Sequence, residues 1–391
     1  MITTLEMAEK IDHQVLRKAV CPICLSSLRY VPVNERSDLV CDLCLSTFYV
    51  IDGLPVFLLC DENWQKKSDE IDGEVEYNVK KIPLEVHVER NSFVDRNTEL
   101  FLGEAGVDLT GREILAVGCS MAELNFYSAR SDHVVCLDIV PQLTKACRQT
   151  TLNRKIKASW ICGDGECLPL ETDSFDIVIV RQTLHHMLKY YSAISEFFRT
   201  CRIGGTVAIV DEPFTGFDPK DMIPNYQDVF RVYKDVSLGH IKDGLGMASQ
   251  TLKGDGAVMD KSLGQRDLDT DIDISTLEKE RQYIHADSSD PETLLADKYH
   301  AFSLLNCIHA IKMHTDDLTL TWPMEVAWTD SSGDTVKFCR GPNPHYGKSL
   351  LEKLVAPGNV SVAAKKLGPT KRLRKIEGLR AISLEALSAL L

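Results

Sequence analysis

The sequence lacks an excess of basic residues. Its 44 Lys and Arg residues are outnumbered by 57 Asp and Glu residues, which gives a formal net charge of −13. Contacts to nucleic-acid phosphates need clustered Lys and Arg, so this balance argues against nucleic acid as a general partner without excluding an RNA substrate. It favours a protein that acts on a small-molecule substrate.

Long apolar runs are missing as well. No run approaches the roughly 20 residues that a membrane helix needs, so we expect no membrane insertion. No charged stub followed by an apolar stretch opens the chain, and no secretory signal is therefore expected. Thirteen cysteines without such a signal are typical of reduced thiols or metal ligands, which indicates a cytoplasmic protein. The oligomeric state is left open.

Two pairs of cysteines stand near the start of the chain. Cys21 and Cys24 form one C-x2-C pair, Cys41 and Cys44 form a second pair, and sixteen residues separate the two pairs. This spacing is typical of a four-thiolate zinc site. Such a tetrahedral site is closed to water, so we predict structural zinc rather than catalytic zinc. Four free thiols in a small β-rich segment are the alternative.

The segment around these cysteines is too small to be held together by a hydrophobic core alone. Metal binding would therefore supply much of its folding energy. Residues 20–59, with the hairpin signal "YVIDGLPVFLL", resemble the zinc-ribbon domain of the activator subunit of tRNA and protein methyltransferases. That ribbon is often fused ahead of methyltransferase domains. We predict a zinc-ribbon domain over residues 1–60 and a linker over residues 61–90.

Residues 91–213 alternate between apolar strands and helical stretches. The strands are "EILAV", "HVVCLDI", "ASWICGD", "FDIVIV" and "GGTVAIVDEP". Continuous apolar strands that alternate with helices predict an α/β fold with a doubly wound, mostly parallel sheet. Ligands of such sheets bind at the carboxyl ends of the strands, so the residues directly after each strand are the functional candidates.

Three successive strands end in a glycine or an acid. Gly118 follows the first strand and allows a ligand to approach the backbone closely. Asp138 ends the second strand at a distance where a carboxylate can bind both hydroxyls of a ribose, although it can equally cap the helix that starts at Pro141. Asp164 ends the third strand and can accept a hydrogen bond from an exocyclic amine. Together they predict a nucleoside-binding site.

Four stretches between residues 114 and 213 resemble the class I S-adenosylmethionine-dependent methyltransferases, especially the small-molecule branch that includes quinone-biosynthesis enzymes. They are "LAVGCSMAEL", "VVCLDIVPQLTKAC", "GDGECLPLETDSFDIVIVRQTLHHM" and "FFRTCRIGGTVAIVDEP". The resemblance implies a Rossmann-like sheet of seven strands and S-adenosylmethionine as the cofactor. It also implies these cofactor-binding residues: Val117, Gly118, Cys119, Ser120, Asp138, Ile139, Asp164, Gly165, Arg181 and Gln182.

The glycine loop departs from the family pattern. The family usually has an acid at position 116, where this chain has Ala116, and glycines at the positions of Ser120 and Ala122. Ser and Ala are small enough to keep the loop if their φ angles stay negative. The missing acid removes an anchor near the ammonium group of the cofactor. A methyltransferase fold that serves as a scaffold or binding protein is therefore the alternative to an enzyme, and RNA methylation is a further alternative.

The chemistry of methyl transfer points to one or two histidines. The enzyme must align the acceptor and, for O-methylation, remove a hydroxyl proton. His186 is the first candidate for this base and His185 the second, because both follow the fourth strand. Glu212, after the fifth strand, is a further candidate. Alternatively, the histidine pair only packs the start of a helix, or the acceptor is a nitrogen.

The remainder of the chain carries weaker signals. Residues 214–292 are rich in Gly and Asp and are interpreted as an insert or lid after the fifth strand. Residues 293–345 are expected to complete the sheet with a hairpin formed by "LTLTWPMEVAWT" and "TVKFC". Residues 346–391 carry seven Lys or Arg residues between Lys365 and Arg380. They are interpreted as a basic helical tail that packs on the acidic body.

Overall fold

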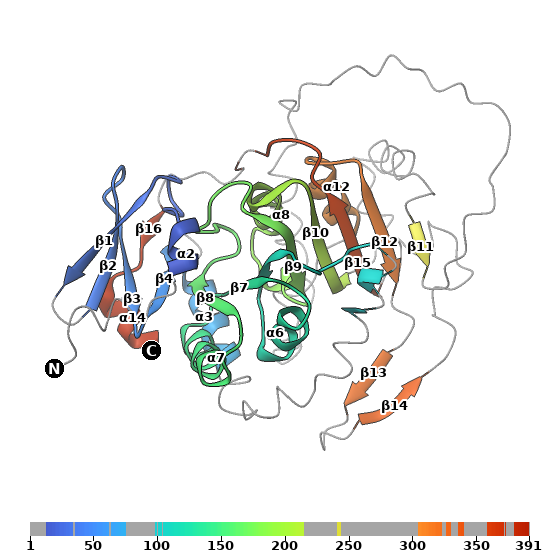
Figure 1. The fold of residues 1–391 in the computed structure, drawn as a ribbon, viewed down its shortest axis with the longest axis horizontal. Helices are drawn as coiled ribbons and strands as arrows, with labels where there is room; N and C mark the ends of the chain where they lie inside the picture. The colour runs from blue at the N-terminus through green and yellow to red at the C-terminus, as the bar shows by residue number, and fades with distance from the viewer. Residues whose placement is uncertain are drawn as a thin grey trace, which may run out of the picture.

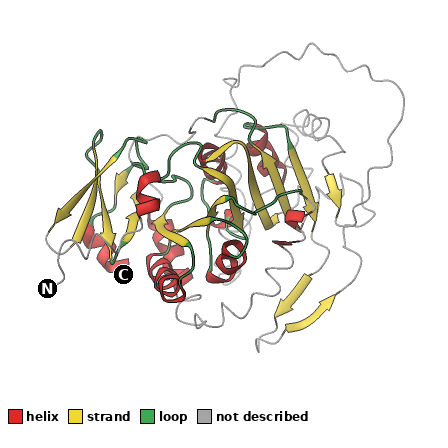
Figure 2. Cartoon of the chain, in the orientation of Figure 1, coloured by secondary structure: helices red, strands yellow, loops and turns green. Residues whose placement is uncertain are grey.

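The structure is a computed structural model of the 391-residue chain, shown in Figures 1 and 2. It describes residues 13–33, 36–61, 64–75, 98–99, 101–103, 105–214, 241–243, 304–322, 326–329, 335–339, 358–370, 372 and 379–390. The predicted lid lies outside these residues, except for Phe214 and the short strand β11 (Ile241–Asp243).

A parallel sheet forms the centre of the molecule, with its strands in the order β8-β7-β6-β9-β10. The strands are β6 (Glu113–Val117), β7 (His133–Asp138), β8 (Ala158–Gly163), β9 (Phe175–Arg181) and β10 (Cys201–Phe214). The helices that follow are α6 (Met121–Ser128), α7 (Pro141–Arg154) and α8 (Tyr190–Thr200). The predicted α/β fold with a mostly parallel sheet is confirmed.

Helices cover both faces of the central sheet, as expected for a doubly wound arrangement (Figure 1). Alternate residues of β6 point to opposite faces: Leu115 belongs to the core cluster that contains α8 and α12 (Leu304–Lys312), whereas Ile114 belongs to the cluster that contains α6 and α7. This alternation follows from the period-two geometry of a strand. The carboxyl ends of the strands form the edge of the sheet where the candidate site lies.

The sheet is larger than the seven strands expected from the sequence. Within the described residues it has 12 strands, because the four ribbon strands hydrogen-bond onto the edge strand β8 and β11 adds a strand at the opposite edge. The ribbon strands are β1 (Leu28–Val33), β2 (Arg36–Cys41), β3 (Thr47–Ile51) and β4 (Leu54–Phe57). Strand β4 runs parallel to β8, with Val56 opposite Cys162 and Phe57 opposite Gly163. The ribbon therefore continues the central sheet instead of forming a separate body.

The predicted boundaries at the C-terminal end need correction. The strand between β10 and β12 (Leu318–Trp322) is β15 (Gly358–Lys365), which lies within the segment expected to be a helical tail. Its residues Val360, Val362 and Ala364 are buried in the core, which explains why the segment is a strand. Strands β13 (Val326–Thr329) and β14 (Thr335–Cys339), expected to complete the sheet, pair with each other in a separate sheet.

The last described residues return to the ribbon. Strand β16 (Arg380–Ala381) pairs with β5 (Leu59–Cys60), and α14 (Leu384–Leu390) lies beside the ribbon strands in Figure 1. Among the described residues of the predicted helical tail, α14 is the part that is helical.

The stretch predicted as a linker contains helix α3 (Trp64–Glu74), whose Ile71 is fully buried. A shorter helix, α2 (His13–Lys18), precedes the ribbon. Within the described part of the chain, no helix combines the length and the apolarity needed to cross a membrane.

Candidate functional site

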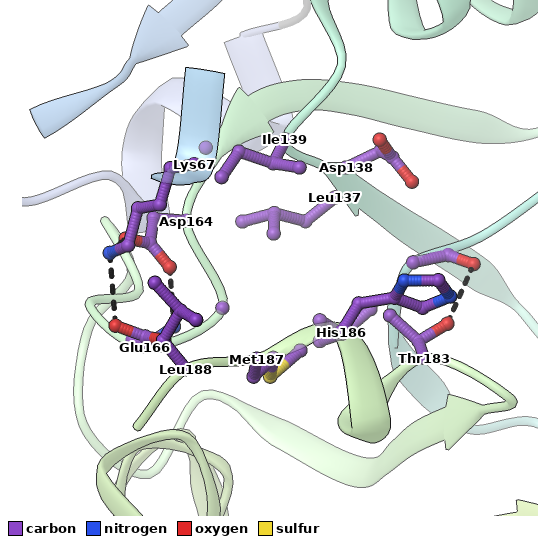
Figure 3. A pocket seen from close by; sticks show the side chains of 14 residues that line it. Lys67, Leu137, Asp138, Ile139, Asp164, Glu166, Thr183, His186, Met187 and Leu188 are labelled. Carbon is purple, nitrogen blue, oxygen red and sulfur yellow. Dashed lines mark hydrogen bonds and ion pairs between the residues drawn. The ribbon is translucent and has the colours of Figure 1, made fainter. Parts of the chain in front are cut away.

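A pocket opens at the carboxyl ends of β6, β7 and β8 (Figure 3). It is lined by Lys67, Val117, Gly118, Leu137, Asp138, Ile139, Gly163, Asp164, Gly165, Glu166, Thr183, His186, Met187 and Leu188. Six of the residues predicted to bind the cofactor are in this lining: Val117, Gly118, Asp138, Ile139, Asp164 and Gly165. The lining also contains His186, the first candidate for the catalytic base.

Gly118 lies at the point where the backbone turns from β6 towards α6. Its φ angle of +68° is in the left-handed region, and an added Cβ would lie 2.2 Å from atoms of the Thr183 side chain. Its N–H donates to the carbonyl oxygen of Leu137 at 2.7 Å. Both the backbone angle and the close approach require glycine here.

The replacement of the second family glycine by Ser120 has a clear structural reason. Ser120 is the N-cap of α6, with a φ angle of −90°, so its side chain causes no backbone strain. Its N–H donates to Oε2 of Glu123 at 2.7 Å and its Oγ accepts from the Glu123 N–H at 3.5 Å, which together form a capping box. Ala122 follows within the first turn of the same helix. Ser120 and Cys119 are not among the lining residues of the pocket.

Asp138 has two structural roles. Its Oδ1 accepts a hydrogen bond from the Val140 N–H at 2.8 Å, next to the helix that begins at Pro141. The N-cap of that helix is Val140 and not Asp138, so the helix-capping alternative is not realised. The same residue lines the pocket, so the contact to Val140 fixes the orientation of a carboxylate at the pocket wall.

Arg181 and Gln182 bind other protein groups and do not line this pocket. Arg181 donates to Oε1 of Glu123 at 3.4 Å and to Oδ2 of Asp211 at 2.9 Å, and Gln182 donates to the same Asp211 oxygen at 3.0 Å. Burial lowers the pKa of Arg181, but the two carboxylates outweigh burial and raise its pKa above the usual value. These contacts tie the ends of β9 and β10 to α6.

Glu212 is fully buried and organises the turn that carries the histidines. Its Oε1 accepts from the His185 N–H at 2.6 Å and lies 2.5 Å from Nδ1 of His185, while its Oε2 accepts from the Thr183 N–H at 3.2 Å. The turn is the short 3-10 helix Leu184–His186. Of the three predicted catalytic candidates, only His186 lines the pocket; its ring centroid is 4.1 Å from that of His185.

Several lining residues were not found by sequence reasoning. Glu166 follows Asp164 by two positions, so its place in the strand-end loop was a usable signal. Met187 and Leu188 follow the histidine pair in the same way. Lys67 comes from α3, 97 residues before Asp164, and carries no local signal that would link it to the pocket.

The four ribbon cysteines come together as predicted. Their sulfur atoms all lie within 4.8 Å of one another. The Sγ atoms of Cys21 and Cys44 are 3.5 Å apart, and those of Cys24 and Cys41 are 3.4 Å apart. Four thiolates at about 2.3 Å from a zinc ion would be separated by about 3.8 Å in a tetrahedron, so the arrangement fits zinc.

The two cysteine pairs lie on turns with the same geometry. Each pair is followed by a leucine with a φ angle of 61°, and the first N–H of each pair donates to a serine carbonyl at 2.9 Å. Burial raises the pKa values of Cys21 and Cys24. Burial also acts to raise the pKa of Cys44, but hydrogen bonds from Ser46 and the neighbouring thiols lower it to about 7.

The comparisons with known proteins agree with the geometry of the pocket. Residues 115–209 match the methyltransferase domain family. This match contains the strands β6 to β9 and most of the pocket.

A stretch of 108 residues is 31% identical to the phthiotriol/phenolphthiotriol dimycocerosates methyltransferase of Mycobacterium leprae, covering 27% of this chain and 39% of that protein. A stretch of 133 residues is 26% identical to the demethylmenaquinone methyltransferase of Lactococcus lactis, covering 32% of this chain and 50% of that protein. The chain thus spans half or less of these relatives. An S-adenosylmethionine-dependent methyltransferase structure from Mesorhizobium loti is 18% identical, with 27% of this chain and 49% of that chain covered and a TM-score of 0.25.

Proposed function

We propose that this protein transfers a methyl group from S-adenosylmethionine to a small-molecule acceptor. The observation that carries the proposal is the convergence of Gly118, Asp138 and Asp164 on one pocket inside a methyltransferase domain. These residues come from the ends of three neighbouring parallel strands, where ligands of such sheets bind.

The chemistry of the pocket supports this cofactor. When bound, S-adenosylmethionine supplies an electrophilic methyl group on a sulfonium. The carboxylate of Asp138 suits the ribose hydroxyls, and Asp164 suits the exocyclic amine of adenine. The glycine backbone at position 118 allows the close approach of the methionine part. Ala116 provides no carboxylate for the ammonium group.

For the acceptor, we propose a hydroxyl group deprotonated by His186. This residue lines the pocket, and an imidazole has a pKa suited to proton transfer near neutral pH. His185 and Glu212 then act as positioning residues, because they hold the turn on which His186 stands. A small-molecule acceptor, of the quinone-biosynthesis type or another, is favoured by the names of the relatives and by the acidic charge.

We also propose that the four-cysteine cluster holds one structural zinc ion. The cluster offers four sulfurs and lies at the ribbon edge of the sheet, and its residues do not line the pocket. It therefore supports folding, while the pocket carries the chemistry.

Turnover distinguishes the enzyme from a scaffold. The protein would be incubated with S-adenosylmethionine and either a deproteinised small-metabolite fraction or total RNA, and S-adenosylhomocysteine formation followed by mass spectrometry. We expect formation with the small metabolites only, and its loss in Asp138→Ala. Formation that depends on RNA would support the RNA alternative. No formation with either, from a protein that binds the cofactor, would support a scaffold.

A further inference from the structure

We propose that Lys67 is a positioning residue that makes the pocket select adenine over a 6-oxopurine; this inference rests on the proposed function. Lys67 belongs to α3, outside both the ribbon strands and the methyltransferase domain match. Its Nζ lies 2.5 Å from Oδ2 of Asp164 and 2.9 Å from Oε2 of Glu166, as Figure 3 shows.

The pairing is buried and therefore well defined. The side chains of Lys67 and Asp164 are each 5% exposed, and that of Glu166 is 2% exposed. The carboxylate of Asp61 lies 3.7 Å from the same ammonium group. Buried charges are costly unless they are paired, so the lysine restrains the positions of the carboxylates around it. Ile71, one helical turn further along α3, is fully buried and anchors this face of the helix.

Both oxygens of Asp164 are oriented by these contacts. Lys67 holds Oδ2, while Oδ1 accepts from the Glu166 N–H at 2.8 Å. Glu166 is itself fixed, because its Oε1 accepts from the Lys189 N–H at 2.8 Å. Asp164 presents this oriented carboxylate at the pocket wall, where it suits a hydrogen-bond donor of a ligand.

The carboxylate that Lys67 orients favours a hydrogen-bond donor on the ligand. Among the described residues, the carboxylates of Asp61, Asp164 and Glu166 lie within 3.7 Å of the Lys67 ammonium group, and Asp164 also lines the pocket. Adenine presents an amino group at C6 and can donate to an ionised Asp164. Hypoxanthine presents a carbonyl oxygen at C6, which an ionised carboxylate repels.

Removing the lysine changes which purine the pocket can accept. Without Nζ, Asp164 and Glu166 lie close together as two like charges, which favours protonation or rotation of one of them. A protonated carboxyl group can donate to a carbonyl oxygen, and a rotated one loses its contact to the amine. The preference for adenine over hypoxanthine should then decrease, in addition to the overall affinity.

The test compares two ligands by calorimetry: S-adenosylhomocysteine and S-inosylhomocysteine. We expect the parent to prefer the adenosyl compound by roughly ten-fold or more, which corresponds to one charge-assisted hydrogen bond. Lys67→Met should reduce this ratio to within about three-fold of unity, whereas Lys67→Arg should keep most of it. Lys145→Met is the matched control, because Lys145 pairs with Asp52 at the surface.

Each outcome decides the inference. An unchanged ratio in folded Lys67→Met, whatever its absolute affinity, would show that Lys67 only stabilises the fold. If Lys67→Met does not fold, Lys67→Gln, which keeps a donor but loses the charge, must show the reduced ratio. A parent that binds neither compound would overturn the proposed function together with this inference, whereas an unchanged ratio overturns the inference alone.

Discussion

The cysteine cluster and the strand-end pocket are built in opposite ways. The cluster comes from two short turns of similar sequence, each of which places its own two sulfurs. The pocket comes from α3, three strand ends and a 3-10 turn that are far apart in the sequence. The first site therefore depends on local geometry and metal, and the second depends on the whole packed sheet. We expect changes in the cluster to affect stability and changes in the pocket to affect function.

A second contrast lies within the strand ends themselves. The ends of β6, β7 and β8 contribute Gly118, Asp138 and Asp164 to the pocket. At the ends of β9 and β10, Arg181 and Glu212 are engaged by other protein groups instead. One half of the opening thus lines the pocket, and most of the other half positions the turn that carries the histidine.

The largest expected effect is the loss of the proposed zinc from the cluster. Apparent binding energies of structural zinc in small domains are about 10–16 kcal/mol, so Cys41→Ser should lose most of the metal and lower the melting temperature. Elemental analysis and thermal unfolding measure both. Cys60→Ser is the matched control, because Cys60 is outside the cluster. A Cys41→Ser protein with full zinc content and stability would refute the metal site.

The next largest effect concerns the chemical step. His186→Ala should slow methyl transfer by about 10²–10⁴-fold, the usual contribution of a general base, with cofactor affinity nearly unchanged. Single-turnover rates and cofactor titration separate the two quantities. If His186→Ala and His185→Ala both transfer methyl at the parental rate, neither histidine is the base, and the acceptor is a neutral amine, a carbon or a hydroxyl that another group deprotonates.

Cofactor affinity should depend on Asp138. The two charge-assisted hydrogen bonds to a ribose are worth about 1.5–3 kcal/mol each, so Asp138→Ala should weaken S-adenosylmethionine binding roughly 10²-fold or more. Asp138→Asn is the informative partner, because an amide oxygen can still accept from the Val140 N–H. Equal affinity in Asp138→Ala and the parent, with the fold intact, would contradict the assignment of this strand end.

The smallest expected effect is a pH-dependent weakening of the contact between ribbon and core. Glu196 is fully buried against Arg199 and Arg372, and Arg372 also donates to the carbonyl of Pro22 in the ribbon. Burial raises the pKa of Glu196, but the two arginines outweigh it and lower the pKa below its ordinary value.

The sign of the pH effect follows from the lowered pKa. Glu196 contributes stability that is fully present above its unfolded pKa of about 4.3 and lost as the pH falls through the folded value. Thermal unfolding of the parent between about pH 6 and pH 3 should show this loss of stability. The Glu196→Gln variant should lose less stability over the same range. If the melting temperatures of the two proteins fall equally as the pH is lowered, this prediction is contradicted.

The sequence predicted the parts of the molecule that depend on local pattern. Apolar strands alternating with helices indicated the α/β fold, and the cysteine spacing indicated the cluster. The segment "VSVAA" was misassigned to a helical tail, because a short apolar run cannot be distinguished from a helix by periodicity alone. The ribbon strand β4 pairs with β8, which is far away in the sequence. The residue pattern of neither strand indicates that the other is its partner, so this pairing could not be predicted.

The sequence pattern does not show where a side chain points, and this limited the prediction of the site. Arg181 lies at a strand end, as the sequence predicted. Its guanidinium group, however, forms ion pairs with Glu123 and Asp211 inside the protein. The capping box at Ser120 likewise depends on Glu123, three residues away. Lys67 was missed because only the packing of α3 brings it to Asp164.

The most direct test of the account is calorimetric titration of S-adenosylmethionine into the zinc-loaded, folded protein. The account predicts one cofactor molecule per chain, displaced by S-adenosylhomocysteine. No binding of either compound to the folded protein would contradict the claim that the ends of β6, β7 and β8 form a cofactor site, and would leave a methyltransferase fold that acts as a scaffold.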